Sequence, residues 1–197
     1  KFMHSVLTQG HLNHRTKRPL KKLVINGGYP LEGTVKISSA KNAALPMMTA
    51  CILSNQDITL NNVPDLADVK TMNTLLKSMG ISINKTLDGS LKLNSGQIKS
   101  KYASYDLVKT MRASIMVLGP LLAKFGSAKV SLPGGCAIGT RPVDIHLEAL
   151  SKLGVKFKII QGYVHAIAPK GLIGSKIRFS KISVGATENL IIAASFA

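Results

Sequence analysis

The sequence has few cysteines, few aromatic residues and no long apolar run. Its 197 residues include two cysteines and no tryptophan, and aromatic residues make up 5%. Two cysteines cannot build a disulfide framework, which indicates a reducing compartment. The apolar runs fall well short of the roughly 20 residues that a membrane-spanning helix needs. Because 45% of the residues are hydrophobic, a globular fold with a core of Leu, Ile, Val, Ala and Met is expected.

Acidic residues are also scarce. Nine Asp and Glu stand against 26 Lys and Arg, which gives a formal net charge of +17. Such a balance favours an anionic partner, whether nucleic acid, a membrane surface or a phosphorylated small molecule, and identifies none of them. Residues 1–22 contain no acid and six Lys or Arg. We expect residues 1–21 to form a flexible basic extension and residues 22–197 to form one incomplete domain. The chain starts with Lys1 and stops inside an apolar helical pattern, which favours part of a longer protein.

From residue 22 onward, short segments in which apolar and polar residues alternate are followed by amphipathic helical segments. This order is typical of a mixed α/β chain. Strands are predicted over residues 33–37, 57–60, 81–84, 91–93, 129–132, 155–160 and 163–167. Helices are predicted over residues 38–53, 68–79, 106–125 and 143–153, and from residue 183. Ser38 and Ser39 are predicted to cap the first helix, and Gly119-Pro120 is predicted to break the third. Asp88-Gly89 and Gln161-Gly162 predict hairpins.

The pattern repeats. Thr74–Ile81 (TLLKSMGI) matches Glu148–Val155 (EALSKLGV) at an offset of 74 residues, and a third copy opens with a predicted strand at Lys176–Phe179. Repeated β-α-β-α-β-β units therefore describe the chain better than a single sheet. The hairpins imply antiparallel pairing, which argues against a doubly wound parallel fold.

Cys136 stands directly after Pro133-Gly134-Gly135. Glycines give the backbone a freedom that a packed strand or helix does not need, so the thiol is expected on a mobile loop, where thiols react. Arg141, five residues later, would lower the pKa of that thiol and can bind phosphate with two hydrogen bonds. A nucleophile pair of Cys136 with His146 stays open, although a helix position favours a packing or surface role for His146. Cys51 reads as a small buried hydrophobe.

Two further basic sites can be anion-binding sites or ordinary solvent-exposed residues, and the sequence alone leaves both interpretations open. Lys41 falls in the first turn of its helix, beside Asn42 and free backbone amides that would suit an anion. It can equally be a solvated lysine. Lys109 and Arg112 share a helix face, which is also typical of a solvent-facing basic stripe. No Cys or His spacing suits zinc, so a metal centre is not expected.

Four long motifs in order carry a family resemblance. They are Ser39–Pro46 (SAKNAALP), Tyr105–Ser114 (YDLVKTMRAS), Leu132–Asp144 (LPGGCAIGTRPVD) and Lys181–Thr187 (KISVGAT). The chain from about Lys22 onward resembles the UDP-N-acetylglucosamine 1-carboxyvinyltransferases, the enolpyruvyl transferases of bacterial peptidoglycan synthesis.

The resemblance implies an inside-out α/β barrel domain of repeated βαβαββ units, of which the chain covers most, with the family's second domain absent. It also implies a reaction, namely transfer of the enolpyruvyl group of phosphoenolpyruvate to the 3-hydroxyl of UDP-N-acetylglucosamine with release of phosphate. That role belongs to the cytoplasm, to cell-wall biogenesis, and so to cell shape and division. Phosphoenolpyruvate and the sugar nucleotide are the implied partners, with no nucleic acid, membrane or cofactor.

Residue roles follow from the same resemblance. Cys136 matches the proton donor that forms a covalent adduct with phosphoenolpyruvate and is alkylated by fosfomycin. The matching substrate-binding residues are Lys41, Asn42, Arg112, Arg141, Pro142, Val143, Asp144, Ile145, Lys181, Ile182, Ser183 and Val184. The family's aspartate for the sugar hydroxyl proton lies in the absent domain, so the chain alone is expected to hold parts of the ligands and to catalyse poorly or not at all.

Two alternatives remain. The chain can be an inactive remnant, or the ligand-binding or partner-binding half of a split enzyme. A basic nucleic-acid-binding module is suggested by net charge alone, and no aromatic platform or nucleic-acid motif supports it.

Overall fold

The computed structural model describes residues 11–12, 19–20, 24–28, 30–37, 39–108, 111–132 and 143–197. The chain divides into two units, Lys1–Ile37 and Ser38–Ala197. In the first unit, β1 (His11–Leu12) pairs antiparallel with β2 (Pro19–Leu20). The strand predicted over residues 33–37 is wrong, since these described residues join no sheet and Val35 and Ile37 are exposed. An alternation of apolar and polar residues does not by itself make a strand, because a strand also needs a hydrogen-bonded neighbour.

The second unit contains helices and two sheets. Its helical elements are α1 (Lys41–Ala50), the 3-10 turn η1 (Cys51–Leu53), α2 (Ala67–Ser78), α3 (Tyr105–Val108), the 3-10 segment η2 (Arg112–Val117), α4 (Leu118–Phe125), α5 (Asp144–Ser151) and α6 (Val184–Ala194). Its strands are β3 (Ile58–Leu60), β4 (Ser82–Lys85), β5 (Leu91–Asn94), β6 (Tyr102–Ala103), β7 (Ser127–Ser131), β8 (Lys156–Ile160) and β9 (Tyr163–Ile167).

The sheets confirm the predicted hairpins. One sheet has the order β3-β5-β4 and the other β6-β7-β9-β8. All pairs in them are antiparallel except β6 with β7. The second copy runs β6, helical segment, β7, α5, β8, β9, which is the predicted βαβαββ order. The strand predicted at residues 176–179 is wrong, because these residues pair with none of the described strands.

The repeat is visible in hydrogen bonds at equivalent places. After α2, Gly80 N–H donates to Lys77 and Ile81 N–H to Leu76. After α5, Gly154 N–H donates to Ser151 and Val155 N–H to Leu150. Both glycines have positive φ, 99° and 88°, a conformation that glycine adopts without steric cost. Each helix therefore ends in the same turn and feeds the same kind of hairpin.

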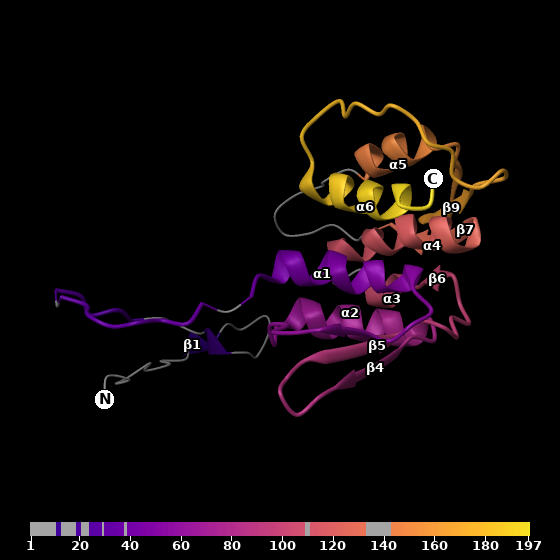
Figure 1. The fold of residues 1–197 in the computed structure, drawn as a ribbon. Coiled ribbons are helices and arrows are strands. Elements are labelled where there is room, and N and C mark those ends of the chain that lie inside the picture. The colour runs from indigo at the N-terminus through magenta and orange to yellow at the C-terminus, as the bar shows by residue number, and fades with distance from the viewer. Residues whose placement is uncertain are drawn as a thin grey trace. The chain divides into compact units, whose positions relative to one another are not determined.

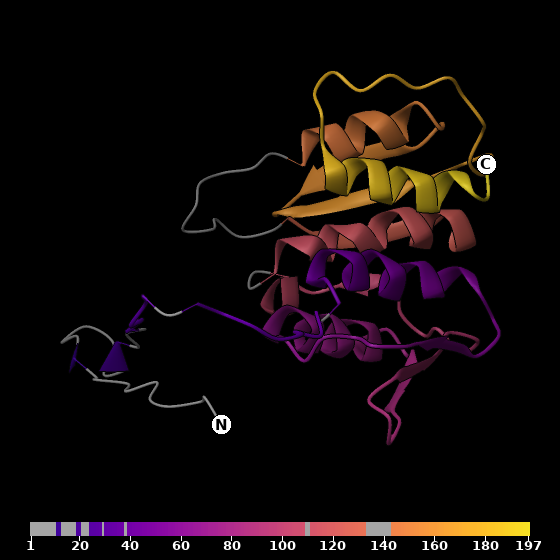
Figure 2. The same ribbon diagram turned by 60° about the vertical axis from the view of Figure 1, so that its left-hand side comes forward.

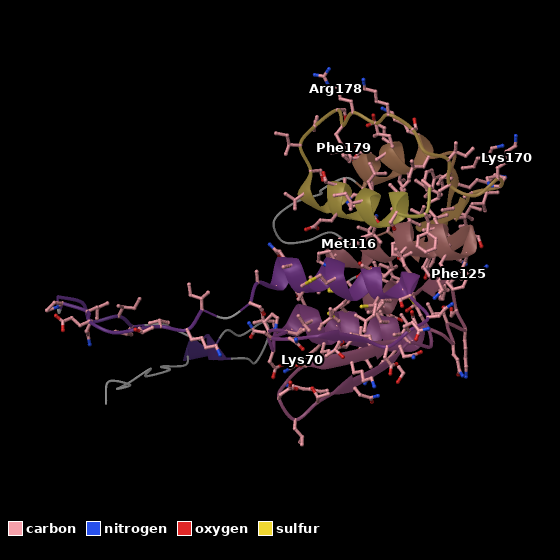
Figure 3. All side chains as sticks on the ribbon, viewed as in Figure 1. Lys70, Met116, Phe125, Lys170, Arg178 and Phe179 are labelled. Carbon is pink, nitrogen blue, oxygen red and sulfur yellow. The ribbon has the colours of Figure 1, made fainter. Side chains whose placement is uncertain are left out.

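Helices α1, α4 and α6 lie side by side, with the strands toward the outside of the unit (Figure 1; Figure 2). Apolar side chains from both copies meet in one core. Its largest fully buried members are Met48, Ile52, Met72, Leu75, Leu76, Met79, Leu93, Leu118, Leu121, Leu122, Leu150 and Leu153. Lysine and arginine side chains such as Lys70, Lys170 and Arg178 point away from this core (Figure 3).

The predicted helix over residues 106–125 is interrupted earlier than expected. The 3-10 segment η2 precedes α4, and Pro120 lies in the first turn of α4 instead of ending a helix. A proline is tolerated there because the first amides of a helix have no partner within the helix. The break predicted at Gly119-Pro120 is therefore wrong in position.

We expect Leu76→Ala to lower the free energy of unfolding by about 2–5 kcal/mol, because the substitution leaves a cavity in the core. Leu76 is 0% exposed, whereas Leu87 at the tip of the β4–β5 hairpin is 110% exposed. The control Leu87→Ala should change the free energy of unfolding by less than about 0.5 kcal/mol. Urea unfolding measures both, and equal losses would contradict this description of the core.

Candidate functional site

Two helices begin within the segments that the motifs single out. Helix α5 follows Val143, and Asp144 in its first turn accepts a hydrogen bond from the Ile145 N–H at 3.0 Å. Helix α6 follows Ser183, whose hydroxyl oxygen accepts from the Ala186 N–H at 3.3 Å. Short polar side chains at these positions bind amides that lack a partner within the helix. The helix predicted from residue 183 is thus confirmed, and the structure adds that Ser183 caps it.

The N-terminal turns of α5 and α6 lie against each other. His146, the third residue of α5, lies close to Gly185, the second residue of α6. A Cβ atom on Gly185 would stand 3.6 Å from His146 Cε1. The His146 ring also hydrogen-bonds Asn189 of α6, with 3.2 Å between Nδ1 and Nδ2. The structure therefore brings together residues 143–145 and 181–184, which are far apart in the sequence.

This end of the unit suits an anion. The N-terminal ends of α1, α5 and α6 face the same side (Figure 1; Figure 2), and each carries the partial positive charge of a helix dipole. Lys181, Ile182 and Val184 are exposed there, whereas Ser183 is half-buried by its capping bond. Exposed backbone amides and an ammonium group can bind phosphate or carboxylate oxygens.

Lys41 begins α1, as the motif predicted, but it has a partner. Its Nζ lies 2.6 Å from Asp68 Oδ2 at the start of α2, and both side chains are partly exposed. A phosphate that binds Lys41 has to displace the Asp68 carboxylate. This displacement costs little, because an ion pair between partly exposed side chains contributes little stability. Asn42 is exposed. The residues at this helix start thus fit an anion site once Asp68 is displaced.

The predicted serine cap of α1 is wrong. The residue before the helix is Ala40, which has no side-chain cap, and the Ser39 hydroxyl donates instead to the Asn62 carbonyl. Ser38 lies outside the described residues. The absent cap leaves the first amides of α1 without a side-chain acceptor from that position, which favours an external anion.

Several predicted site residues fall outside the described part of the chain. They are Lys109, Cys136, Arg141 and Pro142. Arg112 is the first residue of η2, but its side chain belongs to the same undescribed part. Their roles stay predictions.

Cys51 is an inert thiol, as predicted. It is 4% exposed, and its Sγ donates to the Met47 carbonyl at 3.3 Å. Burial raises the pKa of this thiol from the ordinary 9.0 to about 11. The thiolate, which is the reactive form, is therefore rare at neutral pH.

Sequence reasoning missed Asp68, Asn189 and the partner of His146. Asn189 is 1% exposed and directly precedes the apolar run Leu190–Ala194 of α6. A polar residue in such a place is a sequence signal that could have been noticed. The pairing of Lys41 with Asp68 leaves no local signal, because the residues come from different helices.

Two surface hollows lie away from the residues that the motifs single out. One of about 870 Å³ flanks the β4–β5 turn, and one of about 230 Å³ lies between α2 and that hairpin. Neither is lined by a predicted site residue. Within the described ranges, no group of three His, Cys, Asp or Glu could hold a metal ion. None of the described helices is long and apolar enough to cross a membrane.

Comparisons with known proteins agree with the motifs. The family model described as EPSP synthase (3-phosphoshikimate 1-carboxyvinyltransferase) matches residues 25–197. A UDP-N-acetylglucosamine 1-carboxyvinyltransferase of Pelagibacter ubique (strain HTCC1062) is 64% identical over 90% of this chain, and one of Sulfurovum sp. (strain NBC37-1) is 54% identical. The chain spans about 42% of the length of each relative.

Solved structures show the same fold. The enolpyruvyl transferase NikO from Streptomyces tendae superposes with a TM-score of 0.71 at 19% identity, over 86% of this chain and 40% of that one. An EPSP synthase from Acinetobacter baumannii gives 0.63 at 14% identity, over 84% and 38%. The predicted inside-out barrel of βαβαββ units is thereby confirmed, and the chain covers only part of it.

The two cysteines should react very differently with iodoacetamide. In a Cys136→Ser variant at pH 8, we expect almost no labelling of Cys51 in the folded chain, because about one thiol in a thousand is then ionised and burial blocks access. Unfolding in urea should restore labelling. In the folded wild-type chain, iodoacetamide should label one cysteine, Cys136. Mass spectrometry gives the sites, and rapid labelling of Cys51 in the folded variant would refute its burial.

Proposed function

Because the chain belongs to the EPSP synthase (3-phosphoshikimate 1-carboxyvinyltransferase) family, we propose that it supplies the N-terminal part of an enolpyruvyl transferase. The enzyme moves the enolpyruvyl group of phosphoenolpyruvate to the 3-hydroxyl of UDP-N-acetylglucosamine and releases phosphate. The names of the relatives that the chain matches over 90% of its length support this choice of sugar nucleotide. Residues 22–197 form the incomplete domain, and residues 1–21 are a basic extension.

One observation carries the proposal. The N-terminal turns of α5 and α6 meet through His146 and Gly185, so residues 143–145 and 181–184 face one ligand together. Two helix N-termini side by side suit the two phosphates of a sugar nucleotide. The net charge of +17 supports the same proposal, since both substrates are polyanions.

The reaction is an addition followed by an elimination. The sugar 3-oxygen bonds to C2 of phosphoenolpyruvate while a proton is added to C3, which gives a tetrahedral intermediate. The C2–O bond to phosphate then breaks, C3 loses a proton, and the enolpyruvyl ether and free phosphate remain. Protonation at carbon needs a positioned acid, and Cys136 on its glycine-rich loop supplies it.

The basic residues stabilise the charge that develops on the departing phosphate. Lys41 and Asn42 hold phosphoenolpyruvate, and Arg112 and Arg141 are substrate-binding arginines. Fixed cations lower the barrier most when water is excluded. An aspartate of the second domain accepts the sugar hydroxyl proton, so the chain needs that domain for turnover.

The proposed reaction is the first committed step of peptidoglycan synthesis. It places the protein in the cytoplasm and in cell-wall biogenesis, and through them in cell shape and division. Cys136 is then the residue that fosfomycin alkylates.

Phosphate release from phosphoenolpyruvate tests the proposal. We expect no release by the chain alone, with or without UDP-N-acetylglucosamine. Addition of the remaining domain, taken from a relative such as the Pelagibacter ubique enzyme, should give release that requires the sugar nucleotide. A colorimetric phosphate assay measures it.

The matched control is Cys136→Ala, which should remove release in the reconstituted enzyme by removing the proton donor. Cys51→Ala should leave it in place, since that thiol is buried and far from the reaction. Equal release with Cys136→Ala, or release without the sugar nucleotide, would refute the proposal.

A further inference from the structure

Asn189 is a buried amide whose hydrogen bonds join three segments. Its Oδ1 accepts from the Gly119 N–H at 2.9 Å, in the first turn of α4. Its Nδ2 donates to the Ile115 carbonyl of η2 at 3.3 Å and faces His146 Nδ1 of α5 at 3.2 Å. The side chain is 1% exposed, so these partners replace water. We name this group of Asn189, Gly119, Ile115 and His146 the amide clasp.

The donors and acceptors of the amide clasp fix each other. A backbone N–H can only donate and a carbonyl can only accept, so Oδ1 must face Gly119 and Nδ2 must face Ile115. The second proton of Nδ2 then points to His146, whose Nδ1 has to be the acceptor. The neutral His146 ring therefore carries its proton on Nε2. A proton on Nδ1 would place two donors face to face.

Gly119 allows the close approach of α4 and α6. A Cβ atom at Gly119 would stand 2.2 Å from Asn189 Oδ1 and 2.6 Å from its backbone oxygen, distances that no side chain can occupy. A Cβ atom at Gly185 would stand 3.6 Å from the His146 ring, an ordinary van der Waals distance, so only Gly119 is required for the close approach. The helices are thus held close by a polar group that fits only this spacing.

The amide clasp lies directly behind the residues of the proposed site. His146 follows Val143–Ile145 on α5, Asn189 is one turn and a half along α6 from Ser183–Val184, and Ile115 is one turn after Arg112. We propose that Asn189 is a positioning residue, which acts through His146 to set the distance between the N-terminal turns of α5 and α6 and thereby the affinity for the sugar nucleotide. This inference rests on the proposed function.

A purely structural role of Asn189 makes a different prediction. A buried amide stabilises the fold wherever it lies, and its loss lowers stability without changing the affinity of folded molecules. A positioning residue changes the affinity of the folded protein for one ligand. The two roles separate when affinity is measured below the unfolding temperature of every variant.

The experiment is calorimetric titration of the full chain with UDP-N-acetylglucosamine. The variants are Asn189→Leu, of similar size and without hydrogen bonds, His146→Phe, and the two together. His146→Phe keeps the bonds of Asn189 to Gly119 and Ile115 and removes its hydrogen bond to α5. Leu76→Ala is the control for stability, since it weakens the core in the other repeat.

We expect each single variant to bind the sugar nucleotide about three- to tenfold more weakly, because both variants remove the hydrogen bond between Asn189 and His146 and one such bond is worth about this much. The double variant should bind no more weakly than Asn189→Leu, because both act through one link. Leu76→Ala should bind as the wild type does. Wild-type affinity in folded Asn189→Leu and His146→Phe, or losses that multiply in the double variant, would overturn the positioning role and leave the proposed function in place.

Absence of binding by the wild-type chain at millimolar UDP-N-acetylglucosamine would overturn the proposed function, and the positioning role with it. A second measurement tests the amide clasp without ligand. Side-chain ¹⁵N spectra should show the His146 proton on Nε2 in the wild type, and a mixture of the two neutral forms in Asn189→Leu. A proton on Nδ1 in the wild type would overturn the inference.

Discussion

The contact between Gly119 of α4 and Asn189 of α6 sets the spacing on which the second unit depends. The amide oxygen bonds the Gly119 N–H at 2.9 Å where a Cβ atom would stand 2.2 Å away. A buried polar group costs free energy unless each of its hydrogen bonds is made, so the two helices have one acceptable distance. Apolar packing alone tolerates small shifts more readily.

The two repeats are joined by polar links as well as by their common core. The Lys124 ammonium at the end of α4 donates to the carbonyls of Ile52, Ser54 and Ser95, at 2.8, 3.3 and 3.3 Å. Burial lowers the pKa of this amine, and the three carbonyls compensate for the lost water. One end of α4 is thus held by the first repeat and the other by α6, which leaves the starts of α5 and α6 next to each other.

Local signals predicted much of this fold. Gly80 and Gly154 predicted where α2 and α5 end, and Asp88-Gly89 and Gln161-Gly162 predicted the hairpins. The predictions failed where the local structure depends on a partner that is distant in the sequence. Residues 33–37 and 176–179 show the alternation of a strand but pair with no described strand. Ser39 bonds Asn62 instead of capping α1, and Lys41 pairs with Asp68. The amide clasp joins residues 43–74 positions apart, a distance at which spacing gives no signal.

Nuclear magnetic resonance of the chain titrated with UDP-N-acetylglucosamine tests the central claim most directly, namely that the N-terminal turns of α5 and α6 form one binding surface. The account predicts that the amide signals of residues 143–145 and 181–184 move together with a single dissociation constant. Signals that move at only one of the two helices, or only around the β4–β5 hairpin, would contradict it.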